Sequence, residues 1–360
     1  MRRTAYAIAL VLSTFAAFGG VLRNNPNPTL RVPECGEPNA PPFAQDGTPR
    51  VCPPAVQRIY HRRHSGIGYD ILDSESEACF VTDDQFALLD KIVDDATRAI
   101  PIGLAGTRGA RLGIAKNDSA AIGQILESNG FELFIPTDAL SDALFARTED
   151  SRTIHTFDCD TSSFIYLTVA ENLQLPLSMI DITLASGAGH NYVRWQIDNV
   201  TTLDWDTNGR VVCRTPSGLP PTEGKPMTRA QVIGYSRALR AMLWERLKQP
   251  LRALTDLRDS ISMYPESGLA RNNLAWLVAT VDLPGRANLF DEALQQAEKA
   301  VELRRDANRL DTLACVFALR GAFDRAIEVE NDAISLGGST PTLRERLIRF
   351  GQKRDCTGLE

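Results

Sequence analysis

Three residues of types used in nucleophilic chemistry follow one another along this chain of 360 residues. Cys159 opens a helix-like stretch, His190 opens a strand-like stretch, and Asp206 closes the next strand-like stretch. A thiolate can attack a carbonyl carbon, an imidazole can hold and relay the proton, and a carboxylate can fix the tautomer of the imidazole. The pattern predicts a site with Cys159 as nucleophile, His190 as base and Asp206 as the group that orients it.

The element that must position Cys159 is a predicted helix capped by Asp158. Asp is a favourable N-cap residue, so Cys159 falls in the first helical turn. The unpaired N–H groups and the dipole at a helix start favour a thiolate and offer donors to an oxyanion. The carboxylates of Asp158 and Asp160 act against the thiolate. Pro176 ends this helix, and its predicted core face recurs every three residues, at Phe164, Leu167, Ala170 and Leu173.

The elements that must position His190 and Asp206 are two strands of a predicted hairpin. Polar and apolar residues alternate through 190–197, and an Asp-Asn turn signal follows at 198–199. Counting register about this turn places His190 beside Asp206 and leaves Asp204 nearer Val193. Asp206 is therefore the predicted orienting carboxylate, with Asp204 in reserve. Trp195 and Trp205 are expected to pack the opposite face of the sheet rather than a substrate cleft.

The start of the chain is predicted to direct export. Met1 is followed by two arginines and then by an apolar run at 5–22, which is typical of a secretory signal peptide. The run is also near the length that spans a bilayer, so an uncleaved anchor is the alternative. Either way, the remainder is expected to be periplasmic or otherwise extracytoplasmic, and the alternative ties it to the inner membrane. Residues 23–65 are rich in proline and predict an extended linker.

Charge and cysteine content restrict the function further. The formal net charge of −6 argues against nucleic acid as a partner, because phosphate neutralisation needs a basic face. Export favours disulfides among the seven cysteines, and Cys35 with Cys52 is the most natural pair. Cys315 is expected to be a small buried apolar residue, while Cys79, Cys213 and Cys356 are left open. No C-x-x-C spacing, histidine cluster or calcium loop is present in the sequence, so we expect no metal and no cofactor.

Other helical patterns flank the predicted site. Before it, apolar spacing predicts helices that start near Thr82, Asp118 and Pro136. After Thr228, consecutive helix pairs carry small residues at the positions where helices cross, and 321–327 reads Gly-x-Phe-Asp-x-Ala-Ile. This pattern resembles the tetratricopeptide repeat, with about three repeats over 228–352, a longer loop at 282–288 in the second repeat and a capping helix near 343–350.

The cysteine-bearing helix, the His-Asn-Tyr-Val-Arg-Trp strand at 190–195 and the Asp-Trp-Asp-Thr-Asn strand at 204–208 together resemble bacterial transglutaminase-like proteins that carry a tetratricopeptide tail. The resemblance implies an α+β, papain-like domain at 66–224 followed by the all-α repeat array. It also implies acyl chemistry at an amide bond of a protein or peptide, with the acyl-enzyme resolved by water or by an amine.

A non-catalytic scaffold is the alternative function. In this interpretation the front domain is a degenerate enzyme, and the repeats bind a peptide of a partner protein in their concave groove. The two domains are expected to touch lightly. A chain that ends near Gly224 should then keep a reactive Cys159 but lose its partner, and the isolated repeats should fold.

Overall fold

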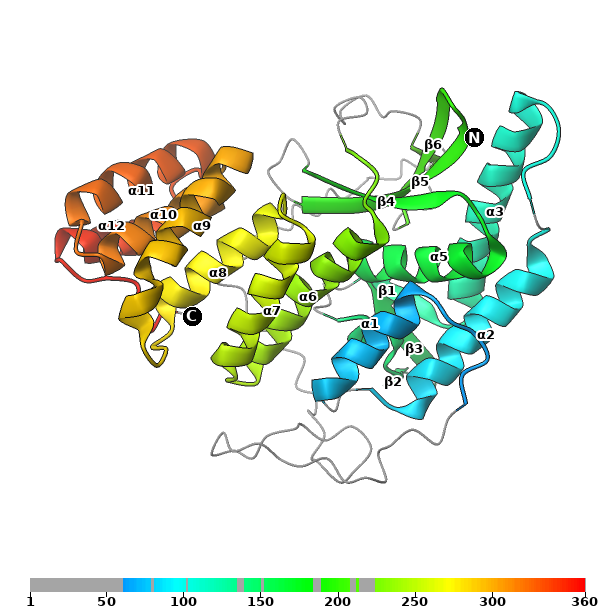
Figure 1. Cartoon of the computed structure of the whole chain (residues 1–360), viewed down its shortest axis with the longest axis horizontal. Helices are drawn as coiled ribbons and strands as arrows, with labels where there is room; N and C mark the ends of the chain where they lie inside the picture. The colour runs from blue at the N-terminus through cyan, green and yellow to red at the C-terminus, as the bar shows by residue number, and fades with distance from the viewer. Residues whose placement is uncertain are drawn as a thin grey trace, which may run out of the picture.

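The protein is an α+β molecule with two lobes, one containing all the described strands and one built from helices (Figure 1). The signal or anchor segment, most of the linker, the Cys35–Cys52 pair and Cys79 lie outside the described residues. The computed structural model describes residues 61–78, 81–101, 103–134, 139–149, 152–183, 189–207, 212–213 and 224–359.

Helices dominate the first part of the front lobe. α2 begins after Thr82, as predicted, with a capping box between Thr82 and Gln85. α3 begins ten residues earlier than the predicted start at Asp118, because the Thr107 hydroxyl caps it by accepting from the Ala110 N–H at 3.3 Å. The helices are α1 (Ile67–Glu75), the 3-10 turn η2 (Ser76–Ala78), α2 (Asp83–Ala99), α3 (Arg108–Ser128) and α4 (Leu140–Leu144).

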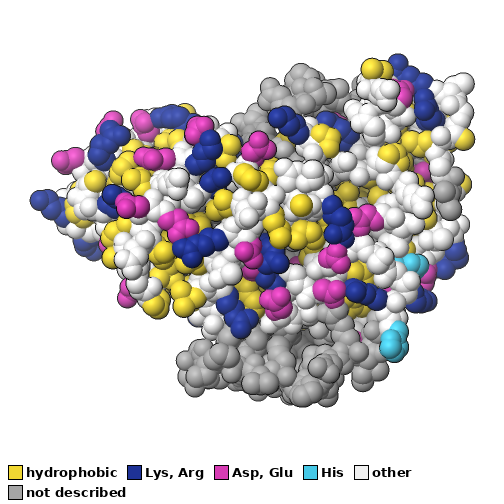
Figure 2. Space-filling view, in the orientation of Figure 1, with side chains coloured by type: hydrophobic (Ala, Val, Ile, Leu, Met, Phe, Trp, Pro, Cys, Tyr) yellow, Lys and Arg dark blue, Asp and Glu magenta, His cyan; other side chains and the backbone are white. Residues whose placement is uncertain are grey.

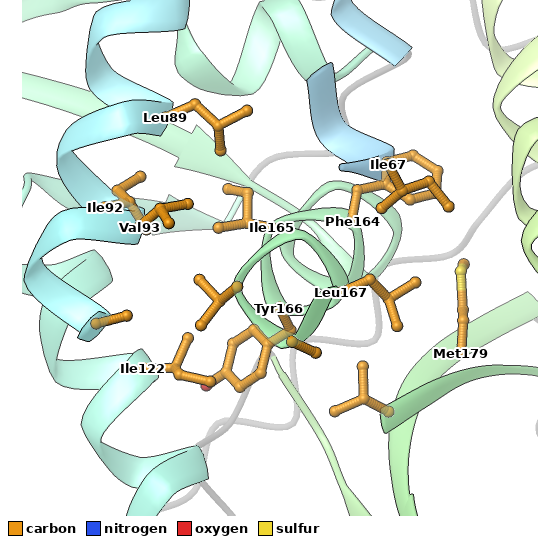
Figure 3. Packing of buried hydrophobic residues seen from close by; sticks show 14 of the residues in the cluster. Ile67, Leu89, Ile92, Val93, Ile122, Phe164, Ile165, Tyr166, Leu167 and Met179 are labelled. Atoms are coloured by element: carbon orange, nitrogen blue, oxygen red, sulfur yellow. The ribbon is translucent and has the colours of Figure 1, made fainter. Parts of the chain in front are cut away.

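Helix α5 (Cys159–Leu173) forms the centre of the front lobe. The sequence predicted one core face, but eleven of its residues are buried, and they point to all sides (Figure 3). Leu89 and Ile92 of α2 lie on one side, and Met179 of β4 lies on another. A helix that is apolar all round belongs in an interior. The core therefore fixes the axis of α5 and the position of its first residue, Cys159.

Two sheets accompany α5. The first has the order β1-β3-β2, with β1 (Phe131–Phe134) parallel to β3 (Arg152–Phe157) and β2 (Arg147–Glu149) antiparallel to β3. β3 leads through Asp158 directly into α5. The second sheet is antiparallel, and its strands in order are β4 (Leu177–Thr183), β5 (Gly189–Asp198), β6 (Thr201–Trp205) and β7 (Val212–Cys213).

The predicted hairpin is formed by β5 and β6, with its register one residue from the expected one. Asp198 pairs with Thr201, so the turn is centred one residue later than the Asp-Asn signal suggested. Asp204 consequently lies opposite Arg194 and not nearest Val193. Trp195 is fully buried and donates from Nε1 to the Ser119 hydroxyl of α3 at 2.7 Å, so it packs in the core as expected.

The second lobe is an array of helix pairs that begins with α6 and ends with α12. Each pair is antiparallel and buries small residues where its helices cross, including Ala238, Ala275 and Ala314. The longer loop of the second pair contains a 3-10 turn, η3 (Arg286–Leu289). The helices are α6 (Arg229–Arg246), α7 (Pro250–Met263), α8 (Gly268–Thr280), α9 (Phe290–Leu303), α10 (Ala307–Leu319), α11 (Phe323–Gly337) and the terminal α12 (Pro341–Gly351).

Helix α6 belongs to both lobes, so the expectation of lightly touching domains is wrong. Buried residues divide into two apolar clusters. Val232, Tyr235 and Leu239 on one side of α6 join the front cluster, whereas Ala241 and Trp244 on another side join the cluster of the array. Figure 1 shows α6 between the two lobes. The physical reason is that α6 is apolar on two faces, and each face needs a cover.

A disulfide corrects the expectation for Cys315. Cys315 of α10 is buried, as predicted, but it is bonded to Cys356 with the Cα atoms 5.5 Å apart. The chain after α12 folds back, and the Gly358 N–H donates to the Thr280 carbonyl at 2.9 Å. This return places Cys356 against α10, which helical periodicity could not indicate.

The surface carries charges of both signs. Over the helical array, Lys and Arg side chains alternate with Asp and Glu side chains on the face seen in Figure 2. Many of them pair, as Arg258 does with Glu292 and Arg305 with Asp332. Among the described helices, none combines the length and the apolar character needed to cross a bilayer.

Candidate active site

Cys159 is the first residue of α5, as the sequence predicted. The Asp158 side chain caps the helix by accepting from the Thr161 N–H at 3.0 Å, and the Thr161 hydroxyl accepts from the Asp158 N–H at 3.0 Å. This reciprocal capping fixes the first turn. Cys159 is partly buried and is a free thiol, in contrast to the disulfide-bonded pair of the array.

The surroundings of the Cys159 sulfur favour the neutral thiol. Burial raises its pKa well above the usual range, and the nearby carboxylates of Asp160, Asp158 and Asp206 raise it further. A hydrogen bond from the backbone N–H of Asn191 acts in the opposite direction. The thiol itself lies 3.7 Å from Asp160 Oδ1, within reach for a weak S–H donor. Burial and acidic neighbours therefore outweigh the helix dipole at this position.

His190 is paired with Asp206. Its Nε2 lies 3.2 Å from Asp206 Oδ2, and both side chains are largely shielded from solvent. Asp204 is engaged elsewhere, because its two carboxylate oxygens accept from Arg194 at 2.6 and 2.9 Å. The prediction that Asp206, and not Asp204, lies beside His190 is confirmed.

A pair of hydroxyls joins the end of β6 to the start of α5. The Ser162 and Thr207 hydroxyls lie 2.6 Å apart in a buried position. Ser162 also donates to the Asp158 carbonyl at 2.6 Å, so the residue after Asp206 is tied to the first turn of the helix. This contact, the Asn191 N–H at the sulfur and the His190–Asp206 pair bring all three predicted residues into one region.

The Cys159 thiol and the His190 imidazole are not hydrogen-bonded to each other, since the thiol meets Asp160 and the imidazole meets Asp206. Consecutive side chains of a strand point to opposite faces, and Asn191 points toward α5 and α6. His190 therefore projects from the other face of β5, where it meets Asp206. Catalytic hydrogen bonds are often long or unformed without substrate. A reactive geometry here requires the imidazole to turn toward the sulfur.

A further group at this site, the Tyr235 hydroxyl of α6, was not predicted from the sequence. It donates to Asp160 Oδ1 at 2.9 Å, and the Asn191 side-chain amide donates to the same oxygen. Burial, followed by the charge of Asp158, raises the pKa of Asp160 to about 8. Tyr235 lies 75 residues from Asp160 in sequence, so only its place on the apolar face of α6 could have suggested a contact with the front lobe.

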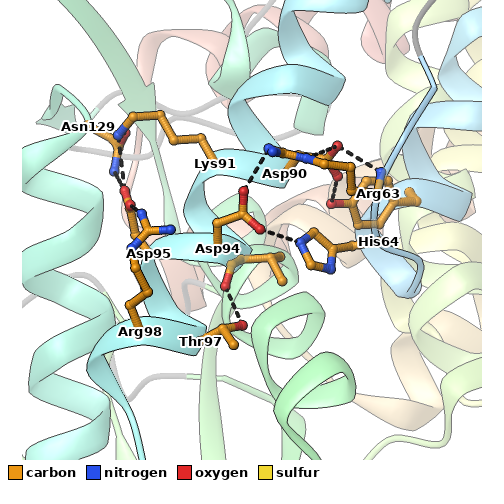
Figure 4. A network of polar contacts seen from close by, with 11 residues as sticks. Arg63, His64, Asp90, Lys91, Asp94, Asp95, Thr97, Arg98 and Asn129 are labelled. Carbon is orange, nitrogen blue, oxygen red and sulfur yellow. Dashed lines mark hydrogen bonds and ion pairs between the residues drawn. The ribbon is translucent and has the colours of Figure 1, made fainter.

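The basic stretch at 61–64, at the end of the predicted linker, has a structural role. His64 Nε2 lies 2.7 Å from Asp94 Oδ1, and Arg63 pairs with Asp94 Oδ2 at 2.7 Å (Figure 4). The Arg63 N–H also donates to Asp90 at 2.9 Å. These bonds hold the stretch on α2, so the folded body begins before residue 66. Within the described residues, no group of three or more His, Cys, Asp or Glu side chains could hold a metal ion.

Comparison with known proteins returned no relative. No protein-family model matches the chain, and no curated protein sequence matches it significantly.

Proposed function

We propose that this protein is an exported, transglutaminase-like cysteine hydrolase or transamidase that acts on an amide bond of a protein or peptide. Cys159 is the nucleophile, His190 the base and Asp206 the group that orients the imidazole. The helix pairs from α6 onward form a tetratricopeptide-like array that recruits the protein partner.

The observation that carries this proposal is the pair of His190 Nε2 and Asp206 Oδ2, 3.2 Å apart. The next residue after His190, Asn191, donates its backbone N–H to the Cys159 sulfur. The pair lies beside a free cysteine at a helix start, because Asp206 is one of the carboxylates that act on the Cys159 thiol. The three residue types, on the three elements that the mechanism needs, favour nucleophilic catalysis.

The reaction would start from the neutral thiol. His190 takes the thiol proton as the sulfur attacks the amide carbonyl carbon, and the N–H groups at the start of α5 face the developing oxyanion. The imidazolium returns the proton to the leaving amine as the C–N bond breaks, which leaves a thioester on Cys159. Water then gives the acid by hydrolysis, or an amine gives a new amide, and either acceptor regenerates the thiol.

Two features support export and protein recruitment. The Cys315–Cys356 disulfide is typical of proteins from oxidising compartments, which agrees with an N-terminal signal peptide or inner-membrane anchor. Stacked helix pairs offer an extended surface for a peptide. On the face of the array that Figure 2 shows, charges of both signs are mixed, whereas nucleic acid requires a basic face.

A second function is favoured by one observation. Burial and acidic neighbours raise the pKa of Cys159, and the thiol has no hydrogen bond to the His190 imidazole. If the imidazole cannot turn, the front lobe would be a non-catalytic module that recognises a peptide, and the array would serve as a scaffold.

Alkylation of the folded protein with limiting iodoacetamide at neutral pH distinguishes the two functions. An enzyme should be modified at Cys159 before its other free thiols, and His190→Ala should slow this modification. His64→Ala is the matched control, because His64 also pairs with an aspartate, but that aspartate is Asp94 of α2. Release of acid or incorporation of a fluorescent amine into a glutamine-containing protein then separates hydrolysis from transamidation. Equal alkylation of the wild type and His190→Ala, with neither product, would establish the scaffold.

A further inference from the structure

Three polar groups from three elements, the Cys159 thiol among them, close around one carboxylate oxygen of Asp160. Asp160 Oδ1 accepts from the Tyr235 hydroxyl at 2.9 Å and from the Asn191 side-chain amide, and it lies 3.7 Å from Cys159 Sγ. The Asn191 amide also donates to the Tyr235 oxygen at 3.0 Å. Three donors thus converge on a single oxygen.

The hydrogen-bonded groups around Asp160 are buried and do not form a solvated surface contact. Asn191 is 1% exposed and Tyr235 7% exposed. The Asn191 amide nitrogen serves Asp160 and Tyr235, while its own Oδ1 is buried without a hydrogen-bond partner. Leaving a buried acceptor unpaired costs free energy, which indicates that donation to the carboxyl dominates the local arrangement.

We propose that Asp160 and Tyr235 are positioning residues for Cys159: the Tyr235 hydroxyl, carried by the first helix of the array, holds the Asp160 carboxyl against the thiol and sets how readily the thiol ionises. The inference deepens the proposed function, because it concerns the same nucleophile. It also makes the array part of the site, since the position of α6 fixes one of the donors.

The electrostatics give the proposal a direction. An ionised Asp160 repels a thiolate on Cys159, whereas a neutral Asp160 does not. Burial raises the pKa of Asp160 to about 8, and the bonds from Tyr235 and Asn191 pull it down. Loss of the Tyr235 hydroxyl should therefore keep Asp160 neutral to a higher pH. The other charged groups that act on the pair come from the surrounding elements: Asp158 of α5, Asp181 of β4 and Asp206 after β6.

The test is the pH profile of Cys159 alkylation by iodoacetamide, followed by peptide mass spectrometry. In the wild type the rate should rise with pH and level off above about pH 8, as Asp160 ionises. In Asp160→Asn it should continue to rise, reaching about tenfold above the wild type at pH 9, because each pH unit beyond the pKa of Asp160 lowers the population of its neutral form tenfold. The two profiles should meet near pH 6.5, where the wild-type carboxyl is neutral.

Tyr235→Phe should shift the levelling to higher pH and lie between the other two profiles at pH 9. Tyr69→Phe is the matched control: its hydroxyl donates to a different buried carboxylate, Asp90 of α2, at 2.6 Å, and its loss should leave the profile unchanged. In the double variant, Tyr235→Phe should add nothing to Asp160→Asn, because the group through which it acts is gone.

An equal effect of Tyr235→Phe with and without the Asp160 carboxyl, or at every pH, would overturn the inference and assign Tyr235 a packing role. Thermal unfolding checks that each variant is folded; if Asp160→Asn does not fold, the contrast between Tyr235→Phe and Tyr69→Phe carries the test. Alkylation does not depend on turnover. If the proposed function is wrong, His190→Ala should leave the rate of Cys159 alkylation unchanged. If only this inference is wrong, His190→Ala should still slow alkylation, but the pH profiles of the Asp160 and Tyr235 variants should not differ as predicted.

Discussion

Removal of the helical array should unfold the front lobe, because α6 supplies part of its core. A chain that ends at Gly224 loses Met227, Val232, Tyr235 and Leu239, all of which are buried in the front cluster. Burying one such side chain contributes about 1.5–3 kcal/mol, so the four together contribute about 6–12 kcal/mol. This loss is comparable to the whole stability of a typical domain, about 5–15 kcal/mol.

A longer chain that ends at Pro265 is the matched control. It keeps α6 and also α7, whose Leu254 and Leu257 cover the opposite face of α6 in the array cluster. We expect this chain to be monomeric by size-exclusion chromatography and to unfold cooperatively by circular dichroism. The chain that ends at Gly224 should aggregate or lack a cooperative transition.

The behaviour of the chain that ends at Gly224 shows whether α6 is part of the front core. If that chain is monomeric, unfolds cooperatively near the midpoint of the full chain and keeps the alkylation profile of Cys159, then α6 is only a neighbour of the front core. The burial of Tyr235 would then contribute nothing that the front lobe needs, and the two lobes would be independent after all.

Three further predictions concern the site and the array. Asp206→Asn should lower kcat for amide hydrolysis by about 100-fold or more in a folded protein, because His190 loses its orienting carboxylate; an unchanged kcat would remove Asp206 from the mechanism. Burial raises the pKa of Glu330 from 4.5 to about 8, so the folded protein keeps a proton that the unfolded chain releases, and stability should fall as the pH rises from about 4.5 to 7.5. Glu330→Gln should remove up to about 4 kcal/mol of that pH dependence in urea unfolding, and parallel pH dependences in both proteins would contradict this assignment. Cys356→Ser should lower the unfolding free energy by about 4 kcal/mol, since the Cys315–Cys356 bond closes a loop with a sequence separation of 41, and the reduced wild type should behave like the variant.

Local pattern predicted most of the elements. The spacing of apolar residues identified α2, α5 and the helix pairs of the array, because a helix that packs on one side must repeat its apolar residues every three or four positions. The cap at Asp158 fixed the place of Cys159, since N-capping depends only on neighbouring residues. Counting register about the hairpin turn selected Asp206 over Asp204, although a turn centred one residue later moved Asp204 opposite Arg194.

The electrostatic environment of the nucleophile was only partly predictable. The sequence showed that Asp158 and Asp160 flank Cys159 and that a helix start acts against them. It could not weigh the two effects, because their balance depends on burial, and burial is set by residues far along the chain. In the structure, burial is the largest cause of the raised pKa of Cys159.

The sequence by itself determined the three residues of the candidate site, the elements that hold them and the change from an α+β lobe to helix pairs, because each of these follows from short-range spacing. The tertiary structure alone decided the contacts between distant segments. The folded-back C-terminus paired Cys315 with Cys356, and α6 entered the front core and brought Tyr235 to Asp160. Such contacts depend on which apolar faces pack against one another. Apolar periodicity predicts that a helix face is buried, but it does not predict which segment of the chain buries it.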